Sequence, residues 1–144
     1  MPKVAKFVAA RVESGLAKER AASGKFLAKA AARPGAVTTE SGLVYLETKA
    51  GSGPAPGPED SVKVHYHGTR NDGSVFDSSR ERGAPAVFSL QGVIPCWTEA
   101  LQRMKVGGTA TIACPAHLAY GDQGTNTIKA AAALQFEIEL IGVE

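Results

Sequence analysis

Apolar and polar residues alternate at every second position over three stretches of the chain. In 62–67 two valines and a tyrosine alternate with a lysine and two histidines, and the same period returns in 109–114 and 134–140. Side chains two residues apart lie on one face of a strand, so each stretch predicts a half-buried β-strand. Shorter apolar runs over 43–48 and 86–90 predict two further strands. The pattern therefore predicts an antiparallel sheet with one buried face.

Two stretches have helical spacing instead. Trp97, Leu101 and Met104 lie three or four residues apart, which predicts one short amphipathic helix that covers the sheet. Residues 3–32 are rich in alanine and end just before Pro34, which a helix cannot include in its interior. They predict one long N-terminal α-helix, and the whole chain belongs to the α+β class.

The chain divides at this proline. We expect an N-terminal helical arm over residues 1–35 and one domain over residues 36–144, which is long enough to form its own hydrophobic core. Phe26 and Leu27, at the end of the arm, are spaced to pack on that domain. An earlier apolar stripe on the arm consists of Val4, Phe7, Val8, Val12 and Leu16.

The apolar stripe of the arm predicts weak self-association. A helix of this kind gains stability when its apolar face is covered. Arg11, Ser14 and Lys18 interrupt the heptad pattern, so a long coiled coil is not expected. We therefore expect a weak homodimer through residues 4–16.

Charge is distributed unevenly between the two parts. The arm holds eight Lys or Arg and two Glu, a net charge of +6, whereas the domain holds eight basic and twelve acidic residues, a net charge of −4. A basic arm is compatible with nucleic-acid binding. A solvated helix face rich in Lys and Arg explains the same charge more simply, and we expect no nucleic-acid partner.

The expected compartment follows from what the chain lacks. No apolar run approaches the about 18–20 residues of a membrane span, and residues 1–12 contain no uninterrupted apolar core of a secretory signal. We expect a cytoplasmic protein, or a periplasmic one if a signal has been removed.

Cys96 and Cys114 have neither CxxC nor zinc-ligand spacing. A cytoplasmic setting disfavours a disulfide, so we expect two free thiols.

The sequence supports neither a metal site nor a hydrolase. His65 and His67 lie on the polar side of one strand at a spacing that chelates a metal ion only with a third ligand, and no acidic or Cys neighbour supplies it. Asp77, Ser78 and Ser79 lack a histidine in a position to act as their base. We expect no metal and no hydrolase.

The domain carries several short motifs, which are VKVHYHG at 62–68, an Asp-Gly turn followed by FDSS at 76–79, VIPCW at 93–97, LAYG at 118–121 and LQFEIEL at 134–140. These motifs resemble those of the FKBP-type peptidyl-prolyl cis-trans isomerases, and the resemblance covers residues 38–144. The segment before residue 36, with GKFL and RPG, further resembles the Mip-like branch (macrophage infectivity potentiator) of bacteria.

The resemblance implies both fold and function. The sheet would be a curved antiparallel half-barrel wrapped around the short helix. The chain would accelerate rotation about Xaa-Pro bonds in protein substrates, without a cofactor, and macrolide inhibitors of the family would bind it. The alternative is a module that holds proline-containing clients, with weak or incidental isomerase activity.

The resemblance also implies a proline pocket. Trp97 would form its floor, Tyr120 and the main-chain N–H of Ile94 would donate hydrogen bonds to a substrate carbonyl, and Asp77 would orient the pocket through Tyr66 or polarise the substrate. The residues implied to line the pocket are Tyr66, Phe76, Asp77, Val93, Ile94, Trp97, Tyr120, Ile128 and Phe136.

The chain departs from the family pattern at three places. Cys96 stands where glycine is usual, and Lys129-Ala130 stand where two prolines are usual. Ala86 stands where some members place a further aromatic residue.

Overall fold

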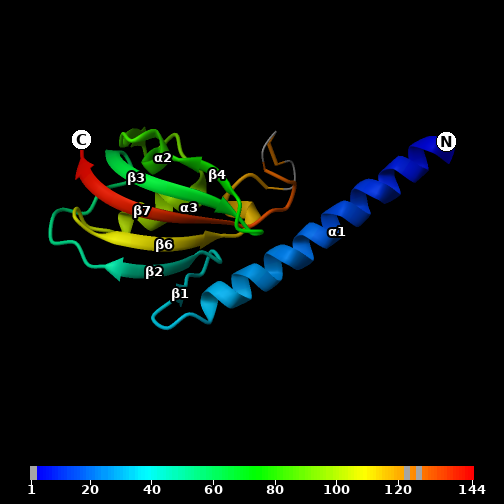
Figure 1. Cartoon of the computed structure of the whole chain (residues 1–144), viewed down its shortest axis with the longest axis horizontal. Coiled ribbons are helices and arrows are strands. Elements are labelled where there is room, and N and C mark those ends of the chain that lie inside the picture. Colours follow the sequence, from blue (N-terminus) through cyan, green and yellow to red (C-terminus); the bar gives the residue numbers. More distant parts are fainter. Residues whose placement is uncertain (1–2, 122–123, 126–127) are drawn as a thin grey trace.

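The computed structural model consists of a curved sheet with a helix packed beneath it, and a long helix that extends away from the sheet (Figure 1). The structure describes residues 3–121, 124–125 and 128–144, and side chains from residue 17 onward. The helices are α1 (Lys3–Ala31), α2 (Ser79–Arg82), α3 (Pro95–Gln102) and the short 3-10 helix η1 (Ala116–Leu118), and the strands are β1 (Val37–Thr38), β2 (Val44–Lys49), β3 (Ser61–Arg70), β4 (Val75–Ser78), β5 (Ala86–Ser89), β6 (Thr109–Cys114) and β7 (Leu134–Val143).

The described residues form one antiparallel sheet of seven strands. The strand order is β1-β2-β6-β7-β3-β4, and β5 pairs with the first half of β3. The long strands β3 and β7 pair along almost their whole length, from Val62 opposite Val143 to Arg70 opposite Leu134. The sheet does not close, and its concave side covers α3. This confirms the predicted α+β fold with a curved antiparallel sheet.

Strand β3 shows why the sheet has one buried face. Val62, Val64, Tyr66 and Gly68 are buried, and the residues between them are partly exposed. Gly68 is required because a Cβ atom there would lie 2.9 Å from Cζ of Phe76. The aromatic ring therefore packs directly against the backbone of the strand.

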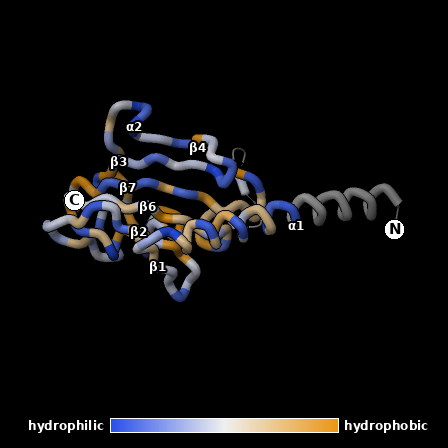
Figure 2. Tube along the Cα trace, turned by 60° about the horizontal axis from the view of Figure 1, so that its bottom comes forward, coloured by the Kyte–Doolittle hydropathy of each residue, from blue (hydrophilic) through white to orange (hydrophobic). Residues whose placement is uncertain are grey.

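Helix α3 supplies the other half of the core. Pro95 begins the helix at a position where its missing N–H is not needed, and the buried side of the helix carries Cys96, Trp97, Ala100 and Leu101. These side chains lie in one hydrophobic cluster with the inner residues of β3, β6 and β7. In Figure 2 the most hydrophobic residues lie in the domain, whereas the described half of α1 mixes hydrophilic and moderately hydrophobic residues.

A disulfide joins α3 to β6, and the expectation of two free thiols is wrong. Cys96 and Cys114 are bonded, with their Cα atoms 5.9 Å apart and both side chains fully buried. The alternation of β6 turns Cys114 toward the first turn of α3. The redox compartment alone does not determine whether two cysteines lie close enough to pair. The two cysteines are 18 residues apart in sequence. For a loop of this size, the chain-entropy model gives a stabilisation of the folded state of about 3 kcal/mol.

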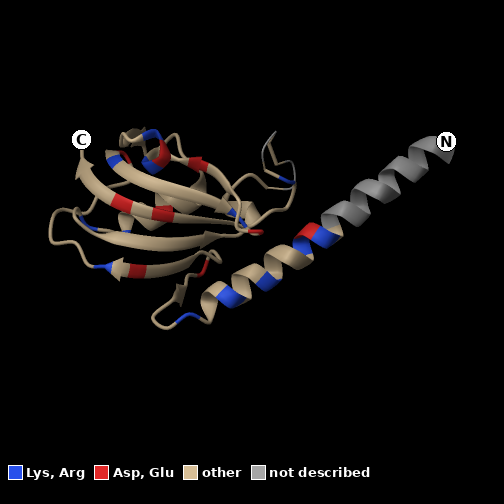
Figure 3. Cartoon of the chain, in the orientation of Figure 1, with Lys and Arg blue, Asp and Glu red and all other residues tan. Residues whose placement is uncertain are grey.

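The end of α1 docks on the outside of the sheet. Phe26 and Leu27 pack with buried Ala30 against Val44 of β2 and Ala113 of β6. Lys and Arg residues are spaced along the described half of the helix, with one acidic residue, Glu19, among them (Figure 3). The earlier stripe, Val4, Phe7, Val8, Val12 and Leu16, lies outside the described side chains, and the predicted division between residues 35 and 36 stays a prediction. None of the described helices is long and apolar enough to cross a membrane.

Candidate active site

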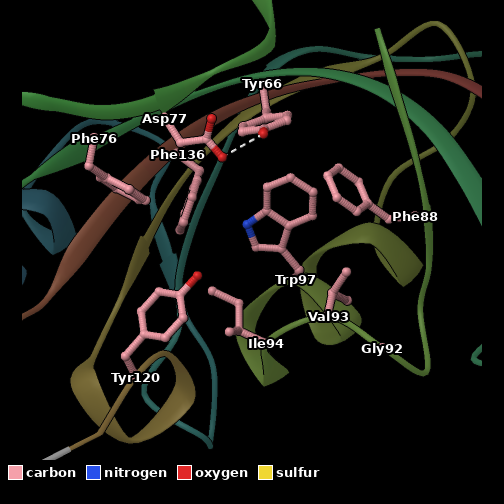
Figure 4. Close-up of a pocket in the computed structure, with 10 residues that line it drawn as sticks. All are labelled: Tyr66, Phe76, Asp77, Phe88, Gly92, Val93, Ile94, Trp97, Tyr120 and Phe136. Carbon is pink, nitrogen blue, oxygen red and sulfur yellow. Dashed lines mark hydrogen bonds between the residues drawn. The ribbon is translucent and has the colours of Figure 1, made fainter. Parts of the chain in front are cut away.

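A cavity of about 280 Å³ opens between the concave side of the sheet and the start of α3 (Figure 4). Its walls come from six parts of the chain: β3, β4, β5, the segment that leads into α3 together with its first turn, the loop after η1 that carries Tyr120, and β7, which carries Phe136. The residues that line it are Tyr66, Phe76, Asp77, Phe88, Gly92, Val93, Ile94, Trp97, Tyr120 and Phe136.

Trp97 is held in the cavity by three aromatic rings packed against it edge to face. The ring centroids of Tyr66, Phe88 and Phe136 lie 5.2, 5.3 and 5.3 Å from that of the indole, with interplanar angles of 77°, 85° and 89°. Phe76 extends the group through an edge contact with Phe136, at 5.6 Å. Such pairs contribute about 0.5–1.5 kcal/mol each beyond their buried area. The indole is therefore a fixed, apolar floor.

Tyr66, Asp77 and Arg82 form a polar group at the edge of this floor. The hydroxyl of Tyr66 donates to Oδ2 of Asp77 at 2.7 Å and accepts from Nη2 of Arg82 at 2.8 Å. Nη1 of Arg82 donates to the other carboxylate oxygen of Asp77. The guanidinium also lies over the ring of Tyr66, 5.6 Å from its centroid. Each hydrogen-bonding group of the three is thus oriented by the other two.

The short helix α2 places Arg82 in this group. The hydroxyl of Ser78 accepts a hydrogen bond from the N–H of Glu81, and this Ser-x-x-Glu sequence is the signature of a helix N-terminus. The neighbouring Ser79 is fully buried and accepts from the N–H of Tyr66 at 2.8 Å. The hydrogen bonds of the two serines therefore fix the position of α2 relative to β3.

The ionisation of the site follows from these contacts. Partial burial alone raises the pKa of the Asp77 carboxyl, but the hydrogen bonds from Tyr66 and Arg82 outweigh it and lower the pKa below its ordinary value. Burial raises the pKa of the Tyr66 phenol, and the hydrogen bond to Asp77 acts in the same direction. Burial and the charge of Asp77 likewise raise the pKa of Tyr120. At neutral pH the site holds one carboxylate and two neutral phenols.

Tyr120 lies at the rim of the cavity. It follows η1 in sequence, and its side chain is 37% exposed. Figure 4 shows its hydroxyl directed across the cavity toward the side where Asp77 and Phe136 lie. A hydroxyl in this place is accessible to a molecule that enters the cavity.

The structure brings eight of the nine expected pocket residues to this cavity and places Ile128 elsewhere. Ile128 is buried in the hydrophobic core, and it lines a separate cavity of about 40 Å³ beside Glu19, Lys129 and Ala132. The pattern of motifs gave no information on the path of the chain after Gly121.

Three residues of the site were missed from the sequence. Phe88 supplies a wall ring, which packs edge to face on Trp97. The alternation in β5 could have identified Phe88, because Ala86 and Phe88 share one face of the strand. Arg82 and Gly92 carried no such signal. The position of Arg82 depends on α2, a helix of four residues, which is too short to show a helical period.

The two strand histidines lie beside serine hydroxyls, so the expectation that Ser78 and Ser79 have no neighbouring histidine is wrong, although both serines are buried away from the cavity. Nδ1 of His65 lies 2.9 Å from Oγ of Ser79, and Nδ1 of His67 lies 2.9 Å from Oγ of Ser78. Within the described part of the chain, no group of three or more His, Cys, Asp or Glu residues is placed to hold a metal ion.

Comparison with known proteins identifies the class of this domain. A family model described as FKBP-type peptidyl-prolyl cis-trans isomerase matches residues 53–141. A second, described as the domain amino terminal to FKBP-type peptidyl-prolyl isomerase, matches residues 1–46. The chain belongs to the FKBP-type peptidyl-prolyl cis-trans isomerase family.

Individual relatives agree with this assignment. The FKBP-type peptidyl-prolyl cis-trans isomerase FkpA of Aeromonas hydrophila is 48% identical over 120 residues, which cover 83% of this chain and 45% of that protein. The outer membrane protein MIP of Legionella longbeachae is 45% identical over 130 residues, 89% of this chain and 56% of that protein. The crystal structure of FkpA from Escherichia coli matches with a TM-score of 0.92 and 40% identity, over 99% of this chain and 67% of that one. The chain spans about half the length of the curated relatives it matches.

We predict that the ionisation of the cavity does not change between about pH 5 and pH 9, since the pKa of Asp77 lies below the ordinary carboxyl value and those of Tyr66 and Tyr120 lie above the ordinary phenol value. A lowered carboxyl pKa stabilises the folded state above the ordinary value, and this stabilisation is lost as the pH falls through the lowered one. NMR titration of the carboxyl and phenol carbons measures all three groups. A midpoint inside the pH window for any of them would contradict the prediction.

Proposed function

We propose that this chain catalyses cis-trans isomerisation of Xaa-Pro bonds in polypeptides. The observation that carries the proposal is the aromatic cavity floored by Trp97, which is large enough for a proline ring and is bordered by a few polar groups. Pockets of this kind, apolar with a small number of placed hydrogen-bonding groups, are typical binding sites for small apolar groups. Membership of the isomerase family supports the same conclusion.

The chemistry requires little more than such a cavity. Resonance gives the peptide C–N bond partial double-bond character and a rotation barrier of about 18–20 kcal/mol. The planar amide carries the charge separation of this resonance, and the twisted amide has lost it. An apolar cavity solvates the planar form less well than water does, so it favours the twisted form relative to the planar one. Each 1.36 kcal/mol gained in this way increases the rate about tenfold.

The polar groups would hold the substrate while it rotates. In this proposal the proline ring lies on the indole of Trp97, and the hydroxyl of Tyr120 and the N–H of Ile94 donate to substrate carbonyl groups. Asp77 holds Tyr66 in the wall and places a negative charge beside the cavity. No covalent intermediate is formed, and no proton is transferred.

We predict that the intact chain accelerates isomerisation of short Xaa-Pro peptides, with bulky apolar Xaa residues preferred because the cavity is apolar. The measurement is a protease-coupled assay, and EDTA is expected to leave the rate unchanged. Tyr120→Phe should lower kcat/KM by about tenfold, the effect of losing one hydrogen bond of about 1.4 kcal/mol. Asp77→Leu should lower it at least as much, because it removes the hydrogen bonds from both Tyr66 and Arg82. Thr111→Ala, on the outer face of the sheet, is the matched control and should have no effect.

Several outcomes would contradict this proposal. A rate equal to the uncatalysed one, for several Xaa residues at micromolar protein, would leave only the holding of proline-containing clients. Full activity in both site variants would show that the polar groups have been assigned wrongly. Macrolide ligands of the family are expected to compete with the peptide for the cavity, and simultaneous binding would separate the macrolide site from the catalytic one.

We infer in addition that the chain self-associates weakly through residues 4–16. Support comes from the apolar stripe in the sequence of this segment, which lies on a helix that extends away from the domain (Figure 1). Sedimentation at several concentrations should show a dimer at high micromolar protein that Phe7→Glu disrupts. A monomer throughout, unchanged by Phe7→Glu, would contradict this inference.

A further inference from the structure

Ser23 is a polar side chain buried where α1 meets the domain. It is 6% exposed, although most of its neighbours on the helix face solvent. Its hydroxyl donates to the carbonyl oxygen of Ala131 and accepts from the N–H of Ala133, both at 2.8 Å. One side chain thus satisfies two main-chain groups that lie more than one hundred residues away in sequence. A buried main-chain group that loses such a partner is costly to the folded state.

A second contact, from Glu19, helps to hold residues 131–133, the segment to which Ser23 is bonded. Oε2 of Glu19, one turn earlier on α1, accepts a hydrogen bond from Nδ2 of Asn71 at 2.7 Å. The same amide nitrogen lies 3.3 Å from the carbonyl oxygen of Ala133. The helix and the turn after β3 therefore hold this segment together.

The held segment is bonded directly to the backbone that carries Tyr120. The N–H of Ala131 donates to the carbonyl oxygen of Gly121 at 2.9 Å, and Gly121 is the neighbour of Tyr120. Ala131 has a φ of 61°, a left-handed conformation that costs free energy in any residue with a Cβ atom. Such a conformation persists only where the surroundings impose it. Here the hydrogen bonds on both sides of Ala131, from Ser23 and to Gly121, impose it.

Tyr120 depends on its backbone for its position. It lies at the rim of the cavity with more than a third of its surface exposed, in contrast to Trp97 and Phe136, which are buried among other rings. A rim hydroxyl that is not packed on all sides is placed mainly by the segment that carries it. The chain of contacts from Ser23 through Ala131 to Gly121 ends next to it.

We propose that Ser23 is a positioning residue of the active site: its hydroxyl, on the N-terminal helix, holds the main chain at Ala131 and so sets the position of Tyr120 over the cavity. The proposal rests on the proposed isomerase function, in which Tyr120 binds the substrate. Because the hydroxyl of Ser23 belongs to α1, the helical arm contributes to the position of a substrate-binding residue in this proposal.

The test uses the full chain and a double-mutant cycle. Ser23→Ala removes both hydrogen bonds, and alanine favours the helix, so α1 is retained. Ser23→Ala is expected to lower kcat/KM for an Xaa-Pro peptide about fivefold, but less than about twofold when Tyr120 is already Phe, because coupled residues are not additive. Ser23→Thr keeps the hydroxyl and should restore most of the activity. Lys25→Ala, exposed on the same helix, is the matched control.

A second readout does not require activity. Amide hydrogen exchange at Gly121, Ala131 and Ala133 should accelerate in Ser23→Ala, while exchange in β3 stays as in the unsubstituted chain. Equal losses of kcat/KM in both Tyr120 backgrounds, or unchanged exchange at these three amides, would overturn the proposal. An unsubstituted chain without isomerase activity would refute the proposed function instead, and the exchange measurement would then decide by itself whether Ser23 holds the segment.

Discussion

The structure depends on the packing of four aromatic rings around one indole. Tyr66, Phe88 and Phe136 each meet Trp97 edge to face, and Phe76 reaches it through Phe136. These rings come from four strands and one helix, so they meet only if the sheet curves around α3. This ring packing in turn requires glycine at position 68, where a Cβ atom would lie 2.9 Å from Phe76 and 3.0 Å from Phe136. Fold and cavity are therefore two consequences of one packing arrangement.

Polar contacts at the edge of the rings add orientation that packing cannot supply. The carboxylate of Asp77 is held by Tyr66 and Arg82. Arg82 belongs to a helix of one turn, and the first residue of this helix, Ser79, and its cap, Ser78, both bond to the main chain of Tyr66. On the other side of the cavity, Tyr120 lies at the rim, and main-chain hydrogen bonds hold its own backbone and that of Gly121. The buried disulfide between Cys96 and Cys114 joins the residue before Trp97 to the strand that leads toward Tyr120. Floor and rim are thereby connected through covalent and hydrogen bonds.

The sequence was most informative where a period determines which face a residue occupies. Alternation predicted the inner faces of β3, β6 and β7, and the motifs predicted Tyr66, Phe76, Asp77, Trp97 and Phe136 at one cavity. It was least informative where the position of a residue depends on partners distant in the chain. Ile128 was expected in the cavity and lies in the core. The sequence between Gly121 and Leu134 has no apolar period from which its position could be predicted. The position of Arg82 depends on α2, a helix of four residues. The disulfide between Cys96 and Cys114 depends on the packing of α3 against β6. Ser23 is bonded to main-chain groups, which every residue has and which therefore give no signal in the sequence.

The central claim is that the indole of Trp97 is the surface on which a proline ring lies. The most direct measurement is the set of intermolecular NOEs between an isotope-labelled chain and an Xaa-Pro peptide under saturating conditions. The account predicts NOEs from the proline ring protons to the indole protons of Trp97 and the ring protons of Phe136, with the proline signals shifted upfield by the aromatic rings. NOEs from the proline to Thr109 and Thr111 on the outer face of the sheet, with none to Trp97, would contradict it.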